Sequence, residues 1–186
     1  MKQSKRILSV TVKRMIDDSP DTSWLGEYSN KPANGFAIDR EHAEDCPLFW
    51  FGEQYGEKEC SCEGHGDRLS RELQYFNPPS ENYKGENILD VREYCLQDYK
   101  RMESYNRQNW CFLGVRAEAE VQAETDGAIQ TLTSGGLWGI ESDSEKSYIE
   151  DEENNQLAEL RGVLKAFGFS SRAISKAFQN IEHKDA

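Results

Sequence analysis

The residues best suited to chemistry gather in one short stretch of cysteine and histidine. Three of the five cysteines and two of the three histidines fall between positions 42 and 65. They are His42, Cys46, Cys60, Cys62 and His65. Thiolate sulfur and imidazole nitrogen are the ligands that zinc prefers, commonly on tight loops. The segment Cys60-Ser-Cys-Glu-Gly-His65 lies in a glycine-rich region that could fold around an ion, so we expect a structural zinc site here.

Two alternatives to a structural zinc site remain open. Cys-x-Cys spacing is less usual for structural zinc than Cys-x-x-Cys, so the stretch could be a surface loop whose thiols stay reduced in the cytoplasm. The loop could also be the centre of a metal-dependent enzyme, with Trp138 and Glu141 lining a cleft beside two adjacent glycines. Neither a Ser-His-Asp arrangement nor a phosphate-binding Gly-x-x-x-x-Gly-Lys motif is recognisable in the chain.

Charge is the strongest signal in the composition. The chain carries a net charge of −12, but residues 1–14 carry +5. Residues 15–153 hold 31 acids against 12 bases, a net charge of −19, and residues 154–186 carry +2. A middle section this acidic repels the phosphates of nucleic acids and attracts basic surfaces. We therefore expect a protein partner with a basic surface, and no direct binding of nucleic acid.

The acids are densest between residues 110 and 153, where eleven acids accompany two bases. We expect them on the outer face of a strand and at the start of the helix that follows. The expected partner-binding residues are Glu118, Glu120, Glu141, Asp143, Glu145, Glu150, Asp151, Glu152 and Glu153. A row of carboxylates on rigid elements can imitate the phosphates that a nuclease or repressor grips. The bland alternative is a solvated surface that keeps the protein soluble.

Strands must position these acids. Residues 110–123 alternate between apolar and polar side chains, which is typical of a half-buried strand with an acidic outer face. An Asp-Gly turn follows, and 128–133 returns as an antiparallel partner. Residues 6–13 alternate too, with Leu8, Val10 and Val12 on one face.

Helices complete the expected fold. The segment 87–107 has an apolar stripe and an Asn87 cap, and we expect it to cover the small inner residues Ala117 and Ala119. Helices at 145–167, capped by Ser144, and at 171–181 form a C-terminal helical hairpin. A helix-turn-helix that reads DNA is disfavoured by the acidic centre. The pattern predicts one α+β domain over 1–186: a mostly antiparallel sheet with helices on one face.

The content of large apolar residues is sufficient for a core. Hydrophobic residues make up 37% of the chain, including eight Phe, eight Tyr and four Trp. No apolar run approaches the length of a membrane span or of a signal-peptide core. We expect a cytoplasmic protein that makes no contact with membranes.

Two segments carry a resemblance to other proteins. Asp98-Tyr-Lys-Arg-Met-Glu-Ser-Tyr-Asn-Arg-Gln-Asn-Trp110 and Ser134-Gly-Gly-Leu-Trp-Gly-Ile-Glu-Ser-Asp-Ser144 resemble a recurring group of small proteins from phages and other mobile elements. The resemblance covers the second half of the chain, implies a phage context and brings no catalytic residues.

The resemblance and the charge pattern together predict an acidic binding protein acting in the host cell. It would engage a basic, nucleic-acid-binding host protein and compete with nucleic acid, as an anti-CRISPR or anti-restriction inhibitor does. The alternatives are a zinc-binding module or metal-dependent enzyme centred on the Cys/His loop, and a structural or virion-accessory protein.

Overall fold

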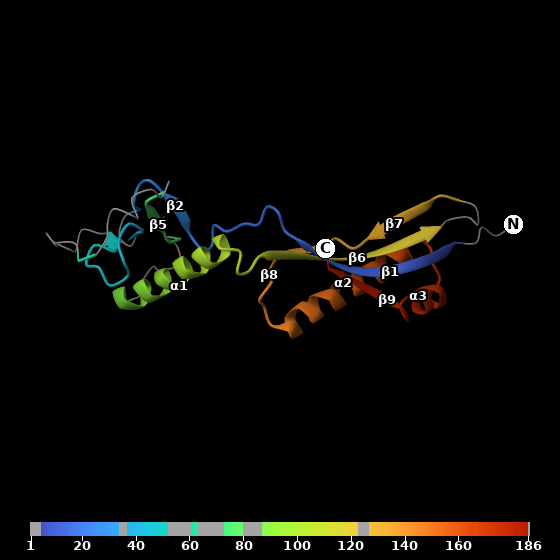
Figure 1. Ribbon diagram of the computed structural model, residues 1–186. Coiled ribbons are helices and arrows are strands. Elements are labelled where there is room, and N and C mark those ends of the chain that lie inside the picture. Colours follow the sequence, from blue (N-terminus) through green and yellow to red (C-terminus); the bar gives the residue numbers. More distant parts are fainter. Residues whose placement is uncertain are drawn as a thin grey trace. The chain divides into compact units, whose positions relative to one another are not determined.

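The computed structural model describes residues 5–33, 37–51, 61–62, 73–79, 87–122 and 127–185. The single domain expected from the sequence is divided here into two compact units (Figure 1). The first unit consists of Met1–Pro20 together with Trp110–Ala186, and the second of Asp21–Asn109. The second unit is therefore an insertion in the chain of the first.

The first unit is built on a mixed sheet. Its strands are β1 (Arg6–Ile16), β6 (Phe112–Gln122), β7 (Ile129–Thr133), β8 (Leu137–Glu141) and β9 (Ile181–Asp185). The strand order is β7-β6-β1-β9, and β8 also pairs with β6. The pairs of β1, β7 and β8 with β6 are antiparallel, whereas β9 runs parallel to β1. The expected pairing of residues 110–123 with 128–133 is confirmed.

Two helices lie on the same side of this sheet, α2 (Lys146–Ala166) and α3 (Ser171–Ala177) (Figure 1). Leu157, Leu160 and Leu164 of α2 are buried in one cluster with Ala117 and Ala119 of β6. The small inner face of β6 is therefore covered by α2. The expectation that the helix at 87–107 covers it is wrong, because α2 packs against this face.

The first strand departs from the expected alternation at Leu8. The register of β1 against β6 shifts between Ile7 and Ser9, so β1 carries a bulge there. An extra residue in a strand reverses the facing of the side chains on one side of it. Val10 and Val12 are buried as expected, but Leu8 is 46% exposed and Ile7 packs against the core instead.

The observed ends of the two C-terminal helices match the ends expected from the sequence only in part. Gly168, with φ at 86°, follows the last turn of α2, and the Ser170 hydroxyl accepts a hydrogen bond from Ala173 N–H at the start of α3. The expected Ser144 cap is wrong, since Glu145 holds the N-cap position of α2. The expected helix at 171–181 is also too long, because Ile181 starts β9.

The second unit has short strands and one long helix. Its strands are β2 (Glu27–Ser29), β3 (Ala37–Asp39), β4 (Trp50–Phe51) and β5 (Tyr75–Asn77), paired antiparallel in the order β2-β5-β3-β4. The helix α1 (Ile88–Asn106) starts at the expected Asn87 cap, whose side chain accepts from Leu89 N–H. The ring of Tyr99 lies 5.4 Å from that of Phe76, so α1 packs on this sheet.

These elements confirm an α+β fold with helices packed on one face of the main sheet. The parallel strand β9 is the feature that the sequence pattern did not predict. None of the described helices combines the length and apolar character that crossing a membrane requires.

Candidate metal centre

Two tight turns after β3 bring the first two ligands together. His42 N–H donates to Asp39 O at 3.1 Å, and Cys46 N–H donates to Ala43 O at 2.9 Å. Phe49 N–H then donates to Cys46 O at 3.0 Å. These turns place His42 and Cys46, four residues apart, with their side chains on the same side of the segment. Cys46 is buried, with 3% of its surface exposed.

The third candidate ligand, Cys62, lies 20 residues from His42 in the chain. The Nδ1 atom of His42 lies 3.5 Å from the Cys46 sulfur and 3.9 Å from the Cys62 sulfur. All three ligand atoms lie within 4.8 Å of one another. Around a tetrahedral zinc ion, with bonds of about 2.0 Å to nitrogen and about 2.3 Å to sulfur, such atoms are separated by about 3.5–3.8 Å. The cluster His42, Cys46 and Cys62 could hold a metal ion.

Backbone amides point at both sulfurs. Ala43 N–H donates to Cys62 Sγ at 3.1 Å, and Leu48 N–H lies 3.5 Å from Cys46 Sγ, also as a donor. Both amides can also donate to the sulfurs when a metal is bound, as groups around metal ligands commonly do.

An acidic residue lies beside the histidine. The Nε2 atom of His42 faces Asp39 Oδ2 at 3.8 Å. The Asp39 carboxylate is itself held by Glu41 N–H at 3.1 Å and by Gln74 Nε2 at 3.0 Å. A carboxylate beside one ring nitrogen favours the proton on that nitrogen, which leaves the lone pair of Nδ1 for a metal. Asp39 is not among the site residues expected from the sequence, although an acid three residues before His42 was the available signal.

Arg40, next to Asp39, connects the segment after β3 to α1. Arg40 donates to Leu73 O at 2.7 Å and to Glu103 Oε1 at 2.9 Å, and its guanidinium lies 4.0 Å from the ring centre of Tyr28. The Tyr28 hydroxyl also donates to Glu103 at 2.9 Å. Burial, together with the charge of Glu103, raises the pKa of Tyr28 well above its ordinary value. These contacts hold the segment that carries the metal ligands against the helix.

The structure brings three of the five expected metal ligands together. The other two, Cys60 and His65, lie outside the described residues. Cys95 is fully buried in α1, and burial raises the pKa of its thiol to about 12. This thiol therefore belongs to the core, as its place in the apolar stripe of the helix predicts.

The acids expected to bind a partner fall into two groups. Glu118 forms ion pairs with Lys13 and Arg116 on the sheet. Glu153 is 5% exposed and lies 2.6 Å from Arg14 Nε. The charge of these two side chains is neutralised inside the first unit, so they do not belong to an outward-facing acidic surface.

The remaining acids lie closer to the surface. Glu120 is exposed and accepts a hydrogen bond from Ser9. Exposed acids near the start of α2 are Asp143, Glu145, Glu150 and Asp151, and Glu150 pairs with Lys146 at 3.2 Å. Glu141 and Glu152 are half-buried. Among the acids expected to bind a partner, all of which lie in the described residues, the exposed ones are thus concentrated around the N-terminal half of α2, and they do not extend as one row along the sheet.

The two adjacent glycines have a structural role. Gly135 N–H donates to Glu159 Oε1 and Gly136 N–H to Gln156 Oε1, each at 3.0 Å, so the connection between β7 and β8 is fastened to α2. Trp138 covers Gly114 of β6, where a Cβ atom would collide with its ring. These contacts give the residues of the Ser-Gly-Gly-Leu-Trp motif a part in the packing of the first unit.

Comparison of the chain with protein-family models, with curated proteins and with solved structures gives no match in any of the three.

Proposed function

We propose that the unit Asp21–Asn109 is a zinc-binding module whose ion has a structural role. The observation that carries the proposal is the spacing of the ligand atoms, 3.5 Å and 3.9 Å from His42 Nδ1 to the sulfurs of Cys46 and Cys62. Two thiolates and an imidazole select zinc over the hard ions Mg²⁺ and Ca²⁺, which prefer oxygen. Zinc in a structural site takes four protein ligands, and Cys60 and His65, close to Cys62 in the chain, are the candidates for the fourth.

The short strands of this unit favour a structural role for the ion. Its described strands are two or three residues long, so each contributes few backbone hydrogen bonds. A metal that joins the turns after β3 to Cys62 would close a long loop and stabilise the folded state directly. The amides that donate to both sulfurs and the carboxylate beside His42 suit a closed, fixed coordination site.

The acidic-competitor function expected from the sequence depends on one continuous row of exposed carboxylates. Glu118 and Glu153 are paired with cations inside the first unit and contribute nothing to such a row. The metal ligands are therefore the stronger basis for a function.

Metal analysis of tag-free protein tests the proposal. We expect one zinc per chain, and loss of zinc in Cys46→Ser and in Cys62→Ser. Cys111→Ser is the matched control, because Cys111 is a half-buried cysteine of the other unit and should leave the zinc content unchanged. Absence of stoichiometric zinc, or equal zinc in Cys46→Ser and Cys111→Ser, would refute the module.

Cobalt substitution identifies the fourth ligand. Thiolate-to-cobalt absorption depends on the number of sulfur ligands, so Cys60→Ser should weaken it if Cys60 binds the ion, and His65→Ala should leave it intact. If His65 binds the ion instead, Cys60→Ser should leave the thiolate absorption intact, and His65→Ala should shift the d–d bands of the cobalt. If neither variant changes the spectrum, the fourth position is open to water, and the catalytic alternative replaces the structural one.

A further inference from the structure

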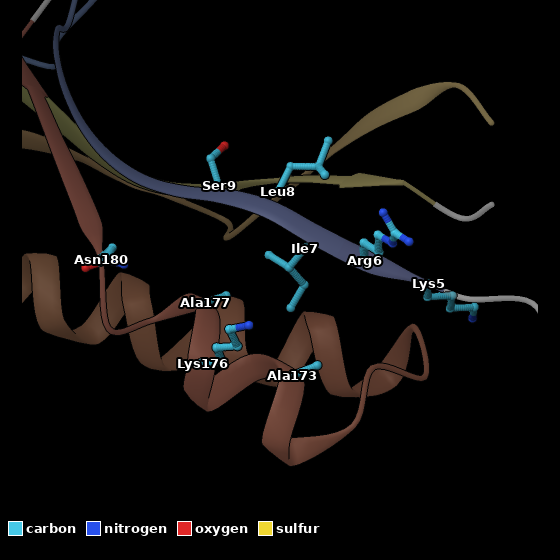
Figure 2. Close-up of a pocket in the computed structure, with 9 residues that line it drawn as sticks. All are labelled: Lys5, Arg6, Ile7, Leu8, Ser9, Ala173, Lys176, Ala177 and Asn180. Atoms are coloured by element: carbon cyan, nitrogen blue, oxygen red, sulfur yellow. The ribbon is translucent and has the colours of Figure 1, made fainter. Parts of the chain in front are cut away.

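The first unit contains a groove between β1 and α3 that is unrelated to the metal ligands. Its volume is about 560 Å³, within the range of ligand-binding pockets. Figure 2 shows the residues that line it: Lys5, Arg6, Ile7, Leu8, Ser9, Ala173, Lys176, Ala177 and Asn180. One wall is the beginning of a strand, and the other is a helix with small side chains.

The strand wall is an open sheet edge. The parallel strand β9 pairs with β1 only over Val10–Arg14, and its first residue, Ile181, lies opposite Val10. Within the described part of the chain, no strand pairs with Arg6–Ser9 on that side of β1. A strand edge presents backbone N–H and C=O groups that can pair with another chain. The groove therefore offers a short ladder of donors and acceptors.

The helix wall leaves room beside this edge. Ile7 points from β1 toward α3, where Ala173 and Ala177 line the groove (Figure 2). Both alanines are half-buried, and their methyl groups occupy little of the space between the strand and the helix. The apolar side chain of Ile7 and these methyl groups can accept one small apolar side chain of a ligand.

The charge of the groove is opposite to that of the whole protein. Lys5, Arg6 and Lys176 line it, and none of the described residues that line it is an acid. The Lys5 ammonium donates to Phe167 O at 2.7 Å, whereas among the described residues no carboxylate forms an ion pair with Arg6 or Lys176. Arg6 belongs to β1 and Lys176 to α3, so each wall contributes a cation without an acidic partner. In a chain of net charge −12, this groove favours an anionic ligand.

We propose that the groove binds an extended, acidic segment of a partner protein, which adds to the open edge of β1 as a short strand. Backbone groups of Arg6–Ser9 would pair with the backbone of the segment, and Arg6 and Lys176 would pair with its carboxylates. The four open residues of the edge span about 13 Å at about 3.3 Å per residue, so four or five residues of the partner are engaged. A nucleic acid fits less well, because its phosphates accept hydrogen bonds and cannot use the carbonyl groups of the edge.

A peptide titration tests this binding on the full chain. The probe is a fluorescein-labelled peptide in which glutamate alternates with valine, and its binding is followed by fluorescence anisotropy. A peptide in which lysine replaces glutamate tests the charge. A third peptide, N-methylated at every residue, tests the backbone pairing, because its backbone has no N–H donors while its charge is unchanged. We expect the glutamate peptide to bind, with an affinity that falls as salt is added, and the other two to bind at least about tenfold more weakly.

Two variants locate the site. Arg6→Glu and Lys176→Glu should each weaken binding of the glutamate peptide by about tenfold or more. Arg172→Glu is the control, because Arg172 is an exposed residue of the same helix that does not line the groove. Circular dichroism of each variant confirms that the fold is retained.

Several results would overturn the proposal. They are equal binding of the lysine or N-methylated peptide, equal loss of affinity in Arg172→Glu, and no binding of the glutamate peptide at all. A short DNA duplex that binds with the same dependence on Arg6 and Lys176 would assign the groove to nucleic acid. Self-association of the protein that Arg6→Glu abolishes would assign it to a second copy. If the glutamate peptide still binds after a chelator has removed zinc, binding in the groove does not depend on the proposed zinc site.

Discussion

A carboxylate on a strand serves solubility, binding or stability according to the charges beside it. Glu118 and Glu120 lie on the same face of β6, and the sequence pattern does not distinguish them. In the structure, Glu118 is nearly buried and receives ion pairs from Lys13 and Arg116, whereas Glu120 is exposed and accepts only a hydrogen bond from Ser9 among its described contacts. The difference arises because Lys13 lies on β1 directly beside this face, a relation that only strand register creates.

The charge of Glu118 predicts a pH-dependent contribution to stability. Burial alone would raise the pKa of this carboxyl group, but hydrogen bonds from Lys13 and Arg116 outweigh burial and lower the pKa below 4.5. A carboxyl group with a lowered pKa in the folded state stabilises the protein above its unfolded pKa and loses that contribution as the pH falls. We therefore expect Glu118→Gln to reduce the free energy of unfolding by about 1–2 kcal/mol at pH 7.

Denaturant titration of both proteins across pH checks the sign. The difference between the natural protein and Glu118→Gln should shrink as the pH falls through the lowered pKa of the folded state, below which the carboxyl group is protonated in both states. Glu120→Gln, from the same face, should change stability by no more than about 0.5 kcal/mol. Equal effects of the two substitutions would show that the ion pairs of Glu118 contribute nothing.

Elements with a strong local pattern could be predicted from sequence. The alternation of β6, the Asn87 cap of α1 and the apolar residues of α2 all depend on neighbours in the chain, so each signal was visible. The start of β9 and the bulge at Leu8 depend on a partner strand far away in sequence and left no local signal. The candidate metal ligands could be predicted in part: their residue types indicated them, whereas the position of Asp39 beside His42 depends on the three-dimensional structure.

Three glycines allow one substitution to be compared in three backbone settings. Gly136 has φ at 81° beside Trp138, Gly139 has φ at 79° with open space around it, and Gly162 lies in α2 with open space. Alanine is strained at positive φ but favoured in a helix. Gly136→Ala and Gly139→Ala should therefore lower the free energy of unfolding by about 1–2 kcal/mol, and Gly162→Ala should raise it by up to about 1 kcal/mol.

Thermal denaturation of the three variants measures these changes. Gly136→Ala should be the more destabilised of the two strained variants, because its Cβ atom would also lie 3.3 Å from Trp138 Nε1. A stabilised Gly136→Ala would mean that the connection between β7 and β8 adopts another backbone conformation in solution.

The whole molecule is an insertion of one unit into a hairpin of another. β1 and β6 are antiparallel neighbours whose register continues to Ile16 opposite Leu113, and Asp17 N–H then donates to Phe112 O at 2.9 Å. The chain leaves the first unit after Pro20 and returns at Trp110, so its exit and entry lie at the same end of this strand pair. The inserted segment is as acidic as the strand that follows it, so the composition does not change at these positions. The boundary between the units therefore could not be predicted from composition.

This topology predicts that the first unit folds without the insertion. Replacing residues 19–109 by a short Asn-Gly turn would join two strands that are already paired, and the core of Val10, Val12, Leu160 and Leu164 would remain complete. We expect the shortened protein to unfold cooperatively, to bind no zinc, and to bind the glutamate peptide with unchanged affinity. An unfolded product would show that the two units stabilise each other, whereas a folded product that retains zinc would place the metal ligands outside the unit Asp21–Asn109.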